Sequence, residues 1–318
     1  MIKRYVLENG KVVEACAPRD GSAGAEGTIL AYIAPDESER KELVEKHGID
    51  RHNLESALDP DEMGRIEQEP DHLVVILKRP RNYCSDDNFL FRVISMGVFL
   101  YSSKMVIVIS DDLTLFEGKH SFKLQALPDV LIKLIYSTIH HFNGHLKVIN
   151  MLSDELEHKI NQSMENKYLL CMFTLEKSLV YFLNAVNSNA AQIEKLKHNA
   201  AKLGFSEENM ELLDDIHLDN QQCLTLVQTY SNILSSLMDA RVSVVSNNLN
   251  VLMKNLTAIS IGVMVPTFFA SVGGMSEFTM MTGQPRWPLA YLLFTLAMIL
   301  AGVVTYLLID RWMQHRAE

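Results

Sequence analysis

The hydrophobic pattern is most uniform in the last quarter of the chain, where two long apolar segments follow one another. The first covers residues 256–272, and the second covers residues 288–309, with no charged residue before Asp310. A helix needs about 20 mostly apolar residues to cross a bilayer. A helix on the surface of a soluble domain keeps a polar face instead. The pattern therefore predicts two transmembrane helices, at 251–272 and 288–309, joined by an outer loop at 273–287 and followed by a tail at 310–318.

Upstream, the pattern changes from strands to helices. Short apolar runs separated by polar or glycine-containing turns predict strands at 5–7, 28–34, 72–77, 93–100 and 105–109. Acidic residues at 36, 37 and 39 predict the start of a helix, which we expect to end at Gly48. From about residue 129 onward the strand pattern is lost. The sequence therefore predicts an α+β domain at 1–128 and a helical region at 129–250.

The helical region ends in a stretch without proline or glycine, from about residue 209 to 261. At 1.5 Å per residue, such a helix is roughly 80–95 Å long and runs into the first span. A helix of this length has no core of its own, so it must pack against neighbours or against copies of itself. We interpret it as the stalk of an oligomer.

Polar and sulfur-containing residues recur on one side of this helix at intervals of three or four, which places them on a single stripe. Polar groups in lipid are costly unless they find partners or line water. One interpretation is close packing between membrane helices. The other is the face of a pore, which two spans cannot enclose and which therefore requires several copies. Periodicity alone leaves both open for Ser246, Asn250, Met253, Thr257, Ser260, Met264, Thr267 and Ser271.

Net charge and motifs narrow the classes of function. The formal net charge of −10 disfavours nucleic acid as a partner and suits a surface that attracts cations. Phosphate-binding loops, nucleophile elbows and zinc-protease motifs are absent from the sequence, which predicts that the chain is not an enzyme and needs no cofactor. The first residues form no apolar signal, so we expect the large domain and both termini in the cytoplasm. Four histidines near helical spacing have no cysteine or carboxylate in register for a metal site: His140, His141, His145 and His158.

Several segments of the chain resemble the CorA family of divalent-cation channels. They include residues 236–239, 243–247 and 253–257, the pair Pro266 and Thr267, and the pair Gly274 and Met275; the stretch 57–80 resembles part of the family's cytoplasmic domain. The resemblance covers nearly the whole chain. It implies a funnel-shaped homopentamer in the inner or plasma membrane, with the first spans innermost around the pore.

The resemblance also assigns expected roles to residues of the stripe. It implies that the stripe lines the pore and that Met253, Leu256 and Met264 form its apolar part. It places Asp239, seven residues before Ser246, in an acidic ring at the cytoplasmic exit. It further implies that Asp215 takes part in regulatory binding of Mg2+ between cytoplasmic domains.

The outer mouth departs from the family pattern. In the family, a Gly-Met-Asn triplet closes the first span, whereas this chain has Gly274, Met275 and Ser276, followed by Glu277. Three functions remain open. The chain is expected to conduct Mg2+, and with it Co2+ or Ni2+, using Ser276 and Glu277; alternatively it transports zinc, or it is a non-conducting, membrane-anchored interaction or sensory protein.

Overall fold

The computed structural model describes residues 1–8, 10–15, 27–112, 115–116, 124–162, 166–274 and 287–315. The chain divides into two compact units, Met1–Met238 and Asp239–Glu318. One helix, α6 (Glu207–Gly273), contributes residues to both units.

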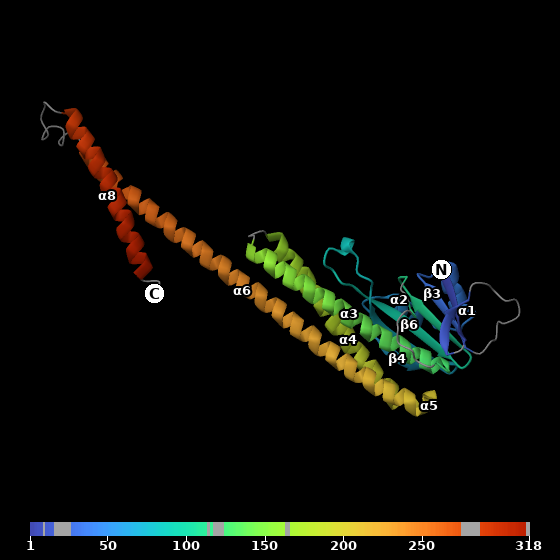
Figure 1. Ribbon diagram of the computed structural model, residues 1–318. Coiled ribbons are helices and arrows are strands. Elements are labelled where there is room, and N and C mark those ends of the chain that lie inside the picture. Colours follow the sequence, from blue (N-terminus) through green and yellow to red (C-terminus); the bar gives the residue numbers. More distant parts are fainter. Residues whose placement is uncertain are drawn as a thin grey trace. The chain divides into compact units, whose positions relative to one another are not determined.

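The first unit contains a seven-stranded mixed sheet in the order β2-β1-β3-β7-β6-β5-β4 (Figure 1). Only β3 and β7 pair in parallel, and the other neighbouring strands are antiparallel. The strands are β1 (Ile2–Glu8), β2 (Lys11–Glu14), β3 (Thr28–Ile33), β4 (Arg65–Gln68), β5 (His72–Pro80), β6 (Val93–Tyr101) and β7 (Lys104–Ile109).

Helices cover both faces of this sheet, because side chains of a strand alternate between its two sides. In β5, Val74 and Ile76 face the short helices α1 (Glu37–Glu45) and α2 (Arg51–Leu58). Their neighbours Val75 and Leu77 join the larger core, which is built with the long helices. Asp36 caps α1 with a complete capping box, in which its side chain accepts from the Glu39 N–H.

Three long helices complete the larger core: α3 (Leu127–Gln162), α4 (Asn166–His198) and the first part of α6, which lie side by side (Figure 1). The short helix α5 (Ala200–Leu203) ends at Gly204, whose φ of 68° is the left-handed conformation that glycine adopts readily. The Ser206 hydroxyl then accepts from the Asn209 N–H at 3.2 Å and caps α6.

The second unit pairs the end of α6 with α8 (Trp287–His315). Small residues of α6 face α8: Ala258 is 1% exposed, and a Cβ on Gly262 would lie 3.4 Å from the Cβ of Tyr306. Small residues of this kind let helices approach closely inside membranes.

The observed elements confirm the predicted fold class of an α+β domain, a long helix and two apolar helices. Two strands were not predicted, β2 and β4, because each has only four residues and shows little burial. Among the described helices, three are long and apolar enough to cross a membrane: α4, α6 and α8. The apolar window of α4 is 39% buried within the protein, against 11% for α6 and 0% for α8. We therefore assign α4 to the core of the first unit.

Candidate ion pathway and acidic cavity

The polar stripe of α6 is exposed along its whole length. Its two methionines are 61% exposed at Met253 and 67% at Met264, and Leu256 is 60% exposed. The other members are also exposed: Asp239, Ser246, Asn250, Thr257, Ser260, Thr267 and Ser271.

The second apolar helix does not cover this stripe. At 3.6 residues per turn, Gly262 lies about 200° around α6 from Ser260, so the face of α6 that contacts α8 is opposite the stripe. Packing between the two apolar helices of one chain therefore does not account for the polar residues of the stripe.

Three hydroxyl groups of the stripe share one hydrogen-bond arrangement. Each donates to the carbonyl oxygen four residues earlier: Thr257 to Met253 at 2.8 Å, Ser260 to Leu256 at 2.8 Å, and Thr267 to Val263 at 2.7 Å. A hydroxyl has one hydrogen to donate and two lone pairs that accept. Because the hydrogen is used within the helix, these side chains offer acceptor oxygens outward.

The C-terminal end of α6 closes with Gly274, whose N–H donates to the carbonyls of Ala270 at 3.0 Å and Ser271 at 3.3 Å. The remaining residues predicted for the outer mouth, Met275, Ser276 and Glu277, lie outside the described residues.

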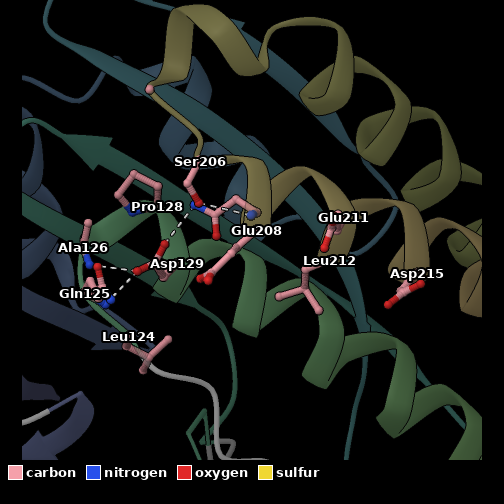
Figure 2. A pocket seen from close by; sticks show the side chains of 12 residues that line it. Leu124, Gln125, Ala126, Pro128, Asp129, Ser206, Glu208, Glu211, Leu212 and Asp215 are labelled. Atoms are coloured by element: carbon pink, nitrogen blue, oxygen red, sulfur yellow. Dashed lines mark hydrogen bonds between the residues drawn. The ribbon is translucent and has the colours of Figure 1, made fainter.

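Asp215 lines a cavity of about 420 Å³ in the first unit, together with other acidic residues (Figure 2). Asp129 is already engaged, because its carboxylate accepts from the N–H groups of Gln125 and Ala126 at 2.7 and 2.9 Å and from the Asn209 side chain at 2.9 Å. Asp129 and Glu208 lie in the first turns of α3 and α6, where carboxylates are favoured by the helix termini. Two carboxylates of the lining remain without such a role, Glu211 and Asp215, and both are exposed.

Metal ligands do not converge within a single copy of the described chain: no three His, Cys, Asp or Glu side chains there are arranged to hold an ion. His141 and His145 instead pack together, with ring centroids 4.5 Å apart, and the ring centroids of Phe91 and His145 lie 5.4 Å apart in a T-shaped arrangement. Burial, together with repulsion from His145 and Arg79, lowers the pKa of His141 to about 3. His145 is buried in the first unit, and His141 is half-buried beside it.

Comparison with known proteins identifies a family and individual relatives of this chain. Residues 25–311 match the family described as CorA-like Mg2+ transporter protein. The chain is 24% identical over 309 residues to the cobalt/magnesium transport protein CorA of Methanocaldococcus jannaschii, covering 92% of this chain and 95% of that relative.

Solved structures show the same fold. The complete structure of the CorA magnesium transporter from Methanocaldococcus jannaschii superposes with a TM-score of 0.77 at 20% identity, covering 98% of each chain. The full-length CmaX protein gives a TM-score of 0.70 at 16% identity, covering 97% of this chain and 96% of that one. At these identities, the structural likeness establishes the fold alone.

Proposed function

The chain belongs to the CorA-like Mg2+ transporter protein family, and from this we propose that it is a passive membrane channel for divalent metal cations, Mg2+ and with it Co2+ or Ni2+. The exposed stripe of α6, which lies opposite α8 and offers acceptor oxygens, is the observation that carries the proposal. Met253, Leu256 and Met264 form apolar rings between these oxygens, where the pore can gate by dewetting.

Acceptor oxygens suit a cation that keeps its water. Mg2+ gives up its hydration shell reluctantly. Water bound to a cation points its hydrogens outward, so the shell donates hydrogen bonds to its surroundings. Thr257, Ser260 and Thr267 accept such bonds without any rearrangement, because their own hydrogens are held by the helix. A hydrated anion would need donors on the wall instead.

Several copies are needed to enclose this pathway, because one chain supplies a single stripe. We propose a homopentamer with α6 innermost and α8 outside it, in the inner or plasma membrane. The domain at 1–128, the helical region at 129–250 and both termini are then cytoplasmic, and residues 273–287 form the outer loop. A mass measurement in detergent that finds a stable monomer would defeat this assembly.

Transport in this proposal needs no cofactor or nucleotide. A membrane potential contributes about 2.3 kcal/mol per elementary charge for each 100 mV, hence roughly 4.6 kcal/mol for a divalent ion. Asp239 provides a carboxylate at the cytoplasmic exit. At the outer mouth, Ser276 is shorter than the family's asparagine and lacks its amide carbonyl, so Glu277 supplies the field that attracts divalent ions.

Regulation is proposed at Asp215. A single copy does not assemble a metal site around it, but its exposed carboxylate is free to contact a neighbouring copy. Mg2+ held between copies would stabilise the closed state when the ion is abundant in the cytoplasm.

Ion flux into liposomes tests the proposal. The full chain is reconstituted, a negative-inside potential is imposed, and uptake of Mg2+, Co2+, Ni2+ and Zn2+ is measured separately and in competition. Thr257→Val removes one acceptor oxygen per copy, and Thr257→Ser keeps it, so valine should reduce Mg2+ flux and serine should not. Thr295→Val is the matched control, because Thr295 is an exposed threonine of α8 that also donates within its helix, to the Leu292 carbonyl at 2.9 Å.

The outcomes separate the candidate functions. Uptake of Zn2+ that Mg2+ does not inhibit would favour the zinc transporter. No uptake of any of these ions by a correctly assembled protein would favour the non-conducting, membrane-anchored protein.

A further inference from the structure

Two glycines meet where α8 crosses α6, and a side chain would be crowded at Gly302, whereas a Cβ on Gly262 would lie at ordinary contact distance. A Cβ on Gly302 would lie 3.0 Å from the Cγ of Pro266 and 3.1 Å from the carbonyl oxygen of Gly262. A Cβ on Gly262 would lie 3.4 Å from the Cβ of Tyr306 and 3.5 Å from the carbonyl oxygen of Gly302. Each glycine therefore faces the backbone of the other helix.

This contact lies at a break in the hydrogen bonding of α6. Pro266 lies inside the helix and has no N–H, so it cannot donate to the carbonyl of Gly262, four residues earlier. A carbonyl without a donor is costly in lipid, and proline is tolerated in membrane helices where a neighbouring helix compensates. Here the neighbour is Gly302: a Cβ there would lie 3.1 Å from that same carbonyl oxygen, so the Cα–H bond that the Cβ would replace is on the side of this oxygen, the arrangement in which closely packed helices form weak Cα–H···O contacts.

The break also lies within the stripe. Met264 and Thr267, on either side of Pro266, are both exposed members of it. A change in bend at Pro266 therefore displaces Thr267 and Ser271 relative to Met264. Proline is a common cause of such bends, because it removes one backbone hydrogen bond of the helix and its ring pushes against the preceding turn.

From this juxtaposition we propose that Gly302 is a positioning residue for ion conduction: it covers the Gly262 carbonyl at the proline break and so sets the bend of α6. The inference rests on the proposed function, because the stripe is taken to line the pore. A side chain at position 302 must either move α8 away or change the bend of α6. Both changes uncover the carbonyl and shift the outer part of the stripe.

Pro266 gives the proposal a specific test. Pro266→Ala restores an N–H that can donate to the Gly262 carbonyl, and it removes the ring atom that lies closest to a Cβ at position 302. Gly302→Ala should therefore lower Mg2+ flux strongly when residue 266 is proline, and much less when residue 266 is alanine. Packing of Gly302 against residues other than Pro266 does not predict that the residue at 266 decides the effect.

The experiment uses the full chain in liposomes, with four proteins: wild type, Gly302→Ala, Pro266→Ala and the double variant. We expect Gly302→Ala to lower Mg2+ flux about tenfold, with the oligomer mass unchanged, because overpacking at this contact is costly. The double variant should conduct within about threefold of Pro266→Ala. Gly144→Ala is the matched control, since a Cβ at that helical glycine meets no atom within 4 Å apart from its chain neighbours and the backbone of its own helix.

Hydrogen exchange of the α6 amides at 267–272 provides a second readout that does not depend on conduction. Exchange should be faster in Gly302→Ala than in wild type and should return in the double variant to the level of Pro266→Ala. Flux and exchange equal to wild type in Gly302→Ala would overturn the inference, as would an equal loss in both backgrounds. If wild type itself conducts no ion, the proposed function fails, and the exchange result still decides whether Gly302 stabilises the break.

Discussion

Asn189 of α4 continues the hydrogen bonding of the sheet beyond the first residue of β4, and replacing it with leucine tests how α4 is held on the sheet. The last pair between β4 and β5 joins Arg65 to Ile76, yet β5 continues to Pro80. Beyond that pair, the Lys78 N–H donates to Asn189 Oδ1 at 2.9 Å, and Asn189 Nδ2 donates to the Lys78 carbonyl at 2.7 Å. The amide thus takes the place of a neighbouring strand.

The magnitude follows from these two bonds. Asn189 is 1% exposed and the Lys78 side chain is 6% exposed, so water does not readily replace the lost partner. Leucine has the same branching as asparagine but neither donates nor accepts, which leaves two buried backbone groups unpaired. Each such group costs about 1–3 kcal/mol, so Asn189→Leu should destabilise the first unit by about 2–6 kcal/mol.

Thermal unfolding and hydrogen exchange of the detergent-solubilised chain measure this cost. For a unit of this size, 2 kcal/mol corresponds to a decrease in Tm of at least about 4 °C. If β5 opens locally, the same energy makes the Lys78 amide exchange about 30-fold faster. Asn187→Leu, at an exposed position of the same helix, is the matched control and should change neither quantity. A free-energy change below about 0.5 kcal/mol in Asn189→Leu would refute this account of the sheet edge.

Three further predictions concern regulation, selection and pH. Asp215→Ala should reduce the protection from protease that Mg2+ gives the wild type, and equal protection of both proteins would remove Asp215 from regulation. Glu277→Gln should lower divalent flux more at low ionic strength than at high, because salt screens its charge over about 10 Å at 0.1 M. Ser276→Asn should shift ion competition toward Mg2+. Unchanged flux and ion competition in both variants would exclude the outer loop as the selectivity site. The pKa of His141 is about 3 in the folded state and 6.5 in the unfolded state, so the unfolded state binds more protons between these pH values, and the free energy of unfolding should fall as pH decreases below about 6.5. His141→Gln should reduce this pH dependence. An identical pH profile of wild type and variant would contradict the role of His141.

Much of the architecture could be predicted because its signals are local and strong. Residues 256–272 and 288–309 stay apolar for longer than a soluble helix requires, and this alone identifies α6 and α8 as candidate spans. Short apolar runs identified the central strands β5 and β6, and the absence of proline and glycine between 209 and 261 identified most of α6. The short strands β2 and β4 escaped prediction, because four residues carry too little periodicity to be distinguished from a turn.

The candidate ion pathway was only partly accessible in this way. Spacing placed Thr257, Ser260 and Thr267 on one stripe, but spacing is the same whether a stripe faces α8 or faces away from it. Only the packed structure, with Gly262 against Tyr306, puts α8 on the opposite face. The direction of the hydroxyl hydrogens likewise depends on the carbonyls four residues earlier, which the formed helix brings within 2.7–2.8 Å.

By itself, then, the sequence determined which segments are helices, strands or spans, because these follow from the order of apolar and polar residues along the chain. Tertiary structure decided which faces meet. Asn189 reaches the backbone of Lys78 across 111 positions of sequence, and Gly302 reaches the carbonyl freed by Pro266 from another helix. Neither partner can be identified from its neighbours in sequence, because both contacts exist only after the chain has brought distant backbone groups together.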